Sequence, residues 1–576
     1  MKPVSALLSF LRSNAIGRVA LAVPVGVAAG VCVTAMTALA EFAHVAIYGI
    51  AFDERLSAKA SVSIFVALAA LCGSGLLLGL VDLWRQRAGS RTIVDPVEAN
   101  ALYGGRLSLR DSLLLVGLSL LSNGVGASVG LEAGYAQIGS ALASRVGAAL
   151  RLRRQDLRML VGCGAAGAIS AAFAAPLTGA FYAFELIIGA YTLGSAAPVL
   201  AAAVAGRLTA HVLGGAPYSI EAPPVPSFGV LPYLALAGLG LVSALLGVAA
   251  MRTAAVIERA FRSRALPVWA RPVVGGALLA SLAALTPQTL GAGHGALALD
   301  LPRTMPAGRL AQLIGLKLSA SLISLASGFR GGLFFASLFI GALVGKLYAI
   351  GVAAAAPEIG LDAAASAFAG MATFSTAIVG GPLTMAFLVL ESSGDVGLAG
   401  PVLAGCVASH LTVKAIFGYS FSTWRLHLRG EDISGAQDVG WVRMLLVAEL
   451  MDRQVQVLSH EATLAAFRTA YPPGGPAFVA LIDAQGRYAG LVSTAQAHAE
   501  GGANETVARF ARTESTTLRC EQNIQQALEA FAETESEVLA VIDAGGRVVG
   551  TLREAYAARR YAAALELASA GVLGGA

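Results

Sequence analysis

Two short segments decide the fold. The first is Gly130-Leu131-Glu132-Ala133-Gly134, followed by Ile138-Gly139. The second lies about 200 residues later and reads Gly332-Leu333-Phe334-Phe335-Ala336, followed by Ile340-Gly341. Both interrupt apolar runs with glycine, which predicts broken helices whose ends lie inside the protein.

A second pair of segments recurs at nearly the same offset. Pro176-Leu177-Thr178 precedes Glu185, and Pro382-Leu383-Thr384 precedes Glu391 at the same spacing. Two matches at nearly the same offset predict a duplicated unit, with copies over residues 15–215 and 228–430. Duplicated units of broken helices are commonly inverted, with an ion site at their interface.

The composition is that of a polytopic membrane protein. Of 576 residues, 56% are hydrophobic and only 13% charged, and the mean hydropathy is +0.71. These values exclude a soluble globular protein, a disordered chain and a nucleic-acid binder. The net charge of +5 comes from cations between apolar runs, where they set topology and contact lipid headgroups. Lys2, Arg12 and Arg18 precede the first apolar run, which predicts a cytoplasmic N-terminus at the cell membrane.

The pattern changes near residue 440. Residues 1–440 are expected to form the membrane domain and residues 441–576 a cytosolic α/β domain. The tail repeats itself: Ala480-Leu481-Ile482-Asp483 and Ala540-Val541-Ile542-Asp543 each lead into a glycine turn and a second apolar run. Each copy follows a helical pattern. The tail is therefore predicted to hold two β-α-β-β-α units.

Glu132 is the candidate gate. It is the only charged side chain between Ser112 and Ser144, and a carboxylate in such a stretch costs at least about 2.5 kcal/mol. Its position after Gly130 predicts a helix N-terminus, which favours negative charge and would bind a small anion equally well. Glu132 would then compete with the anion and could also carry a proton. The alternative is a structural cap or a glutamate that faces water.

Phe334 occupies the place of Glu132 in the second copy. The backbone N–H groups of Leu333, Phe334 and Phe335 are the expected anion contacts there, together with those around Glu132. The alternative is an aromatic residue packed within a helix. The full set of predicted contacts is Gly130, Leu131, Ala133, Gly134, Gly332, Leu333, Phe334 and Phe335.

Glu185 and Glu391 share a spacing and hence a predicted structural role. Each stands in apolar surroundings after a Pro-Leu-Thr segment. Capping of a neighbouring helix end is favoured over a part in a proton path. The chain has no P-loop, no Gly-x-Ser-x-Gly and no paired catalytic carboxylates, and its five cysteines form no CxxC pair. We therefore expect no enzyme, no cofactor and no metal site.

These segments resemble the CLC family of chloride channels and proton/chloride exchangers. Residues 130–139 look like its G(K/R)EGPxxQIG segment, with Glu132 at the gating glutamate. Residues 331–336 look like GGxFxP, residues 290–295 like its Gly-rich joint, and residues 388–391 like LVLE. The tail resembles a CBS-domain pair. The resemblance implies a polytopic inverted-repeat fold, a homodimer and chloride transport.

The chain departs from the family pattern at several site positions. Ile93 stands in place of an anion-contacting serine, and the matching tyrosine falls within residues 419–422, with Ser422 aligned and Tyr419 nearby. Leu186 replaces the second, inner glutamate that exchangers often carry. Passive chloride conduction is therefore favoured. The alternatives are a proton/chloride antiporter and, more remotely, a transporter of another small anion or a non-transporting sensor.

The CBS-like tail also departs from the nucleotide-binding pattern. Such units usually end with an aspartate that holds a ribose, whereas this chain has Gln496 and Tyr556 at those places. Tight binding of an adenine nucleotide is therefore not expected.

Overall fold

The computed structural model describes residues 14–52, 54–90, 92–215, 229–263, 266–427, 445–512 and 516–561. The chain divides into two compact units, Met1–Asp438 and Val439–Ala576, each described here by itself. The predicted domain boundary near residue 440 and the N-terminal Lys2 and Arg12 lie outside the described residues.

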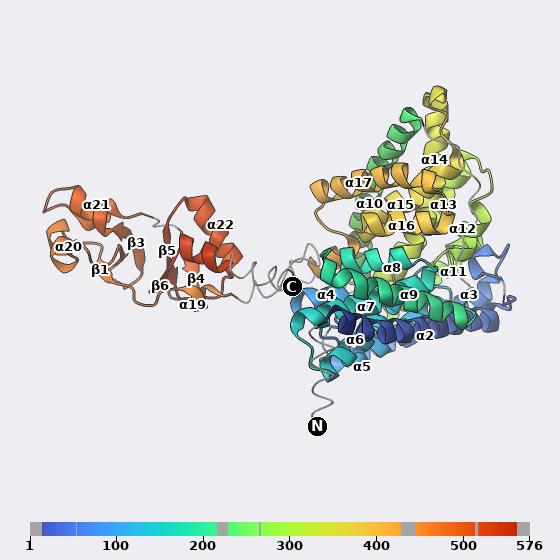
Figure 1. The fold of residues 1–576 in the computed structure, drawn as a ribbon, viewed down its shortest axis with the longest axis horizontal. Helices are drawn as coiled ribbons and strands as arrows, with labels where there is room; N and C mark the ends of the chain where they lie inside the picture. The colour runs from blue at the N-terminus through green and yellow to red at the C-terminus, as the bar shows by residue number, and fades with distance from the viewer. Residues whose placement is uncertain are drawn as a thin grey trace. The chain divides into compact units, whose positions relative to one another are not determined.

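The first unit is helical throughout its described part (Figure 1). Its first half contains α2 (Ala15–Tyr48), η1 (Leu56–Ala58), α3 (Ile64–Arg87), α4 (Pro96–Leu102), α5 (Leu109–Gly124), α6 (Glu132–Ala149), α7 (Arg154–Phe173), α8 (Pro176–Tyr182), η2 (Ala183–Ile188) and α9 (Leu193–Val212). Its second half contains α10 (Val230–Phe261), η3 (Val268–Ala270), α11 (Arg271–Leu285), η4 (Pro287–Thr289), α12 (His294–Asp300), α13 (Ala307–Ser327), α14 (Phe334–Ala355), η5 (Pro357–Ile359), α15 (Ala363–Val379), α16 (Pro382–Ser393), η6 (Val396–Leu398), α17 (Ala399–Ile416) and α18 (Phe421–His427).

Nine helical stretches among the described residues are long and apolar enough to cross a membrane. Large apolar side chains also cover the outer faces of several of them. Leu39 on α2, Phe65 on α3 and Leu245 on α10 are 58%, 81% and 56% exposed. Exposure of so broad an apolar surface is unfavourable in water but favourable in contact with lipid. The predicted polytopic helical fold is confirmed.

The duplication is visible in the packing. In the first half α6 packs on α7 and α2 on α9, and in the second half α14 packs on α15 and α10 on α17 (Figure 1). The same glycines allow the close crossings. A Cβ on Gly139 would lie 2.2 Å from the carbonyl oxygen of Gly164, and one on Gly341 would lie 2.3 Å from that of Gly370. Side chains at either crossing would force the helices apart.

The breaks between helices follow local rules. α7 ends at Ala174 (φ 57°) and α15 at Gly380 (φ 93°), both in the left-handed conformation that closes helices. α8 and α16 then begin with Pro176 and Pro382 at their first positions, where no N–H is needed. Two short helices thus start inside the unit, and α8 packs against α16.

The second unit holds two three-stranded sheets of the same design. The first copy contains β1 (Val457–Ser459), α20 (Leu464–Ala470), β2 (Phe478–Ile482), β3 (Tyr488–Ser493) and α21 (Thr494–Ala499). The second contains β4 (Leu518–Arg519), α22 (Ile524–Thr534), β5 (Val538–Ile542), β6 (Val548–Arg553) and the helical residues 554–561. The short elements α19 (Val447–Leu450) and η7 (Val507–Phe510) complete the unit.

Strand order and direction also repeat. β2 pairs parallel with β1 and antiparallel with β3, and β5 pairs in the same way with β4 and β6. Oδ1 of Asp483 accepts hydrogen bonds from the backbone N–H groups of Gln485 and Arg487, which closes the first turn and holds the pKa of Asp483 below its ordinary value. Oδ1 of Asp543 closes the second turn in the same way. The predicted pair of β-α-β-β-α units is confirmed.

Candidate functional site

The two segments that decide the fold meet at their glycines. The N–H of Gly130 donates to the carbonyl of Gly332 at 2.9 Å, and the N–H of Gly332 donates back to the carbonyl of Gly130 at 3.0 Å. This antiparallel bridge joins equivalent positions of the two copies. α6 and α14 begin two residues further on, at Glu132 and Phe334. Their N-terminal ends, which favour negative charge, therefore lie together.

The Glu132 carboxylate lies at this junction. Its side chain is 3% exposed, and the backbone N–H groups of Glu132 itself and of Phe335 point to the carboxylate. Its Oε2 has no hydrogen-bond partner among the residues that the structure describes. The carboxylate thus contacts both helix N-termini, while one oxygen keeps free capacity to accept a further donor.

Gly130 makes room for this carboxylate. A Cβ at position 130 would lie 1.9 Å from Oε2 of Glu132 and 2.6 Å from its Cδ. At Gly332, the equivalent residue of the second copy, a Cβ would lie 3.8 Å from the same Oε2. The Glu132 side chain therefore folds back over the first glycine and not over the second.

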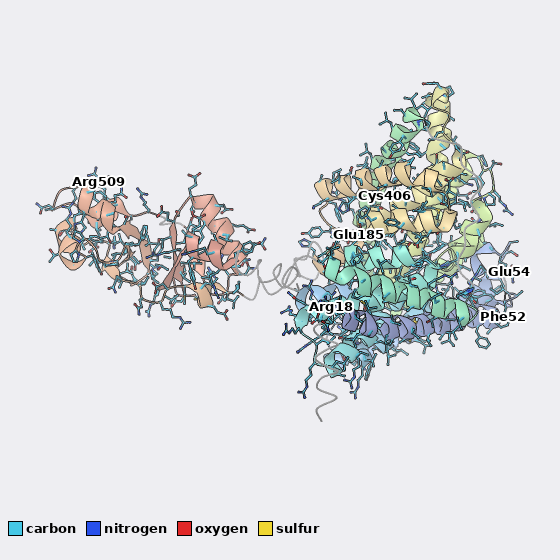
Figure 2. The ribbon with its side chains drawn as sticks, in the orientation of Figure 1. Arg18, Phe52, Glu54, Glu185, Cys406 and Arg509 are labelled. Carbon is cyan, nitrogen blue, oxygen red and sulfur yellow. The ribbon has the colours of Figure 1, made fainter. Side chains whose placement is uncertain are left out.

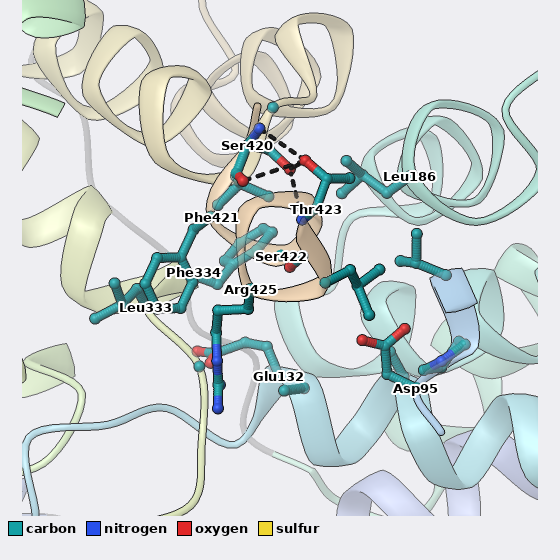
Figure 3. A pocket seen from close by; sticks show the side chains of 18 of the residues that line it. Asp95, Glu132, Leu186, Leu333, Phe334, Ser420, Phe421, Ser422, Thr423 and Arg425 are labelled. Atoms are coloured by element: carbon teal, nitrogen blue, oxygen red, sulfur yellow. Dashed lines mark hydrogen bonds between the residues drawn. The ribbon is translucent and has the colours of Figure 1, made fainter. Parts of the chain in front are cut away.

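A cavity of about 660 Å³ opens beside Glu132 (Figure 3). It receives side chains from α4, α6, η2, α14 and α18, elements far apart in the sequence. The predicted site residues that line it are Ile93, Glu132, Ala133, Glu185, Leu186, Gly332, Leu333, Phe334, Tyr419 and Ser422. Gly130, Leu131, Gly134, Phe335 and Glu391 do not line it. The nearest atom to a Cβ on Gly134 would be Cε of Met36, so this residue packs against α2 instead.

Aromatic rings form one wall of the cavity. Phe334 is 5% exposed, and its ring centroid lies 5.0 Å from that of Phe173 and 6.2 Å from that of Tyr182. Behind it, the His294 ring stacks on Phe335 at 3.6 Å. Apolar packing thus fixes the first residues of α14, so the backbone N–H groups there are held in one orientation.

Ile93 and Asp95 stand at another wall, before α4. Ile93 offers the cavity an apolar side chain in place of a hydroxyl. Oδ1 of Asp95 accepts from the backbone N–H of Glu98 at 2.8 Å and so caps α4, with Pro96 next to it. Asp95 also lines the cavity (Figure 3). Asp95 was not among the predicted site residues, although an aspartate before a proline is a recognised helix start.

Tyr419 and Ser422 both line the cavity. The Tyr419 hydroxyl shares a 3.3 Å hydrogen bond with Nδ1 of His427, and the two rings stack at 4.7 Å. Ser422 is the second residue of α18 and lines the cavity (Figure 3). Neighbouring Ser420 and Thr423 bond to each other.

Glu185 and Glu391 each cap a helix that belongs to the other copy. Glu185 accepts from the N–H groups of Leu383 and Thr384 at 2.9 and 2.8 Å and from the Thr384 hydroxyl at 2.6 Å. Glu391 accepts from the N–H groups of Leu177 and Thr178, both at 2.8 Å, and from the Thr178 hydroxyl at 2.7 Å.

These contacts cross between the copies. A carboxylate from the first copy closes the N-terminus of α16, and one from the second closes the N-terminus of α8. Figure 2 shows Glu185 where these two helices adjoin. Equal spacing in the sequence indicated a shared role, and the structure adds that the partners are exchanged.

Several charged residues of the cavity were missed in the sequence. Arg330 forms an ion pair with Asp82, with N···O distances of 2.8 and 3.0 Å, and both line the cavity. Arg85, Lys414 and Arg425 line it as well. Arg330 could have been predicted from the sequence, because it stands directly before the Gly331-Gly332 segment.

Comparisons with known proteins agree with this architecture. Residues 72–414 match the family described as voltage gated chloride channel. A putative chloride channel protein ClcB-like from Ralstonia nicotianae is 30% identical over 352 residues, covering 59% of this chain and 81% of the relative. A voltage-gated ClC-type chloride channel ClcB from Citrobacter koseri is 28% identical over 353 residues, covering 61% and 83%.

Solved structures share the fold. A slow cyanobacterial Cl⁻/H⁺ antiporter aligns with a TM-score of 0.61 at 21% identity, covering 72% of this chain and 97% of its own. A eukaryotic CLC transporter aligns with a TM-score of 0.60 at 18% identity, covering 95% and 98%.

Fold and site together define a multi-pass membrane protein in which two duplicated helical units bring helix N-termini to one buried carboxylate. The family match spans more than half of the sequence. The chain therefore belongs to the voltage gated chloride channel (CLC) family.

Proposed function

We propose that the protein moves chloride across a membrane through the cavity beside Glu132, and that Glu132 gates this movement. The observation that carries the proposal is the buried carboxylate at two helix N-termini, held by backbone N–H groups of both copies. Such N–H groups bind any small anion. Carboxylate and chloride therefore compete for one place.

Protonation of Glu132 is expected to open the gate. A neutral carboxyl group is held less strongly by helix N-termini than a carboxylate. Acidification therefore releases Glu132 and frees the site for chloride. Because Oε2 has no partner among the described residues, release breaks few contacts.

Passive conduction is the favoured mode. Leu186 presents an apolar side chain where exchangers of the family pattern often carry an inner glutamate. Glu185 is no substitute, because its carboxylate already accepts three hydrogen bonds from α16. The second candidate is a proton/chloride antiporter. Asp95 favours it, because this carboxylate also lines the cavity.

Proton coupling separates the two modes. Chloride efflux from proteoliposomes should be recorded together with external pH. We expect chloride to move without proton movement against a gradient. Uphill proton transport driven by chloride would assign the antiporter mode, and absence of any anion flux would contradict the proposed function.

The assembly and the tail complete the proposal. We infer a homodimer with one pathway in each subunit, both termini in the cytoplasm, and no catalytic activity. The two β-α-β-β-α units fit a CBS pair that regulates transport. Because Gln496 and Tyr556 stand where an aspartate would hold a ribose, we expect no thermal stabilisation of the purified protein by adenine nucleotides.

A further inference from the structure

Several hydroxyl groups line the cavity, and three of them near the start of α18 have partners. Ser420 and Thr423 bond to each other, and the Tyr419 hydroxyl bonds to His427. These groups would have to break existing contacts before they could donate to an anion. The serine of the family pattern is replaced by Ile93, which has no donor.

Tyr182 differs from these groups. It is the last residue of α8 and lines the cavity. In the part of the chain that the structure describes, no hydrogen bond is recorded for its hydroxyl. Its ring lies beside that of Phe334, 6.2 Å between centroids and at 58°. The Tyr182 side chain is thus fixed by an aromatic neighbour, while its donor remains available.

Its position relative to the gate is equally informative. Two carboxylates, those of Asp95 and Glu132, line the same cavity as Tyr182. Phe334, its ring neighbour, is the first residue of α14. Tyr182 therefore lies beside the N-terminus of α14, in the cavity that Glu132 also lines.

We propose that the Tyr182 hydroxyl donates a hydrogen bond to the transported anion and so replaces, from α8, the donors that this chain has lost. The inference rests on the proposed anion transport. A partly dehydrated anion needs donors besides backbone N–H groups, and an O–H donor to a charged acceptor is among the stronger hydrogen bonds. The hydroxyls of Tyr419, Ser420 and Thr423 hold partners, whereas Tyr182 can donate without breaking a hydrogen bond.

The test is Tyr182→Phe, which removes the hydroxyl and keeps the ring contact with Phe334. The matched control is Tyr135→Phe. Tyr135 lies one turn from Glu132 on α6, but it does not line the cavity and its hydroxyl bonds to Thr37 at 2.8 Å. Chloride efflux from proteoliposomes is measured over a series of chloride concentrations for the parent and both variants.

We expect Tyr182→Phe to raise the chloride concentration at half-maximal flux about tenfold, the loss typical of one hydrogen bond to a charged group. Maximal flux should change much less, because the gate is intact. Tyr135→Phe should match the parent. A general packing defect would lower maximal flux in both variants and leave the half-maximal concentration unchanged.

A second measurement does not depend on flux. Chloride that binds the folded protein raises its thermal midpoint, and Tyr182→Phe should need about tenfold more chloride for the same rise. If the parent transports chloride but Tyr182→Phe and Tyr135→Phe respond alike, the role of Tyr182 is wrong and the proposed function stands. If the parent moves no chloride, the proposed function fails and the role of Tyr182 fails with it.

Discussion

Gly130→Ala is expected to open the pathway at neutral pH, whereas Gly332→Ala should leave transport close to the parental rate. The two glycines are equivalent in the two copies and bond to each other. A Cβ at position 130 would lie 1.9 Å from Oε2 of Glu132, which no side chain tolerates. At position 332 the nearest atoms are Cβ and N of Ala133, at 3.5 and 3.7 Å, and Oε2 of Glu132 at 3.8 Å, all at ordinary contact distance.

The physical reason is competition for one place. Neither glycine has a positive φ, so alanine fits both backbones, and both variants keep the backbone N–H groups at the two helix N-termini. Only the first expels the Glu132 carboxylate. A hydrogen bond to a charged group contributes about 1.5–3 kcal/mol. Since about 1.4 kcal/mol is a factor of ten, loss of the carboxylate should raise flux at neutral pH tenfold or more.

The three proteins should also differ in how chloride flux depends on pH. In the parent, flux should rise as pH falls, because protonation of Glu132 releases it from the helix N-termini. In Gly130→Ala the carboxylate is already displaced, so flux should be high and nearly independent of pH. Gly332→Ala should keep the parental profile. The measurement is chloride efflux from proteoliposomes between acidic and neutral pH.

Glu132→Gln provides the reference for an uncharged gate. It should give the same flattened profile as Gly130→Ala, without a new side chain at position 130. Equal behaviour of the two alanine variants, in protein with parental thermal stability, would contradict the assignment of Glu132 as the gate.

The sequence was sufficient for the elements whose determinants are local. Glycines and prolines at repeated spacings predicted the broken helices and their duplication, because these residues end or begin helices wherever they stand. A lone carboxylate after Gly130 predicted a helix N-terminus for the same reason, and α6 begins at Glu132. The two β-α-β-β-α units followed from turn residues and alternating apolar runs.

The rest of the site depends on contacts between distant segments. Tyr182 stands in an apolar run and has the pattern of a packed aromatic, and only the docking of α8 beside α14 brings it to the cavity. Asp95 and Arg330 are likewise separated in the chain and converge only in the folded unit. Local patterns specify where a helix starts but not which neighbour its end faces.

The crossed carboxylates, Glu185 and Glu391, show the same limit of prediction from sequence. Spacing assigned Glu185 and Glu391 a common role, but it could not give their partners, which lie about 200 residues away. Each carboxylate contacts the helix that corresponds to its own helix in the other copy. This exchange depends on how the two copies pack together, which no single segment encodes.

Removal of either crossed carboxylate should strongly destabilise the membrane unit. Glu391→Ala deletes the acceptor of two backbone N–H groups and one hydroxyl at the start of α8, and Glu185→Ala does the same at α16. The backbone donors at both helix starts then lose their acceptor. We expect each change to cost on the order of 3 kcal/mol, measured as a lower midpoint of thermal unfolding in detergent.

Two milder variants should cause a smaller loss of stability. Thr178→Val and Thr384→Val remove only the hydroxyl donors and keep both N–H bonds to the carboxylates. Each should cost about 1.5 kcal/mol, the lower value for a hydrogen bond to a charged group. The two copies should respond equally, because the distances at the two caps differ by no more than 0.1 Å.

The same variants separate a cap from a proton carrier. A carboxylate that carries protons would alter the ratio of protons to chloride when changed to glutamine, and it would do so at Glu185, which lines the cavity, but not at Glu391, which does not. A cap would alter stability at both places and the ratio at neither. Because the hydrogen bonds of Glu185 and Glu391 are matched, we expect equal losses of stability and unchanged coupling, and a change of coupling confined to Glu185→Gln would show that the inner acid of this pathway is Glu185 after all.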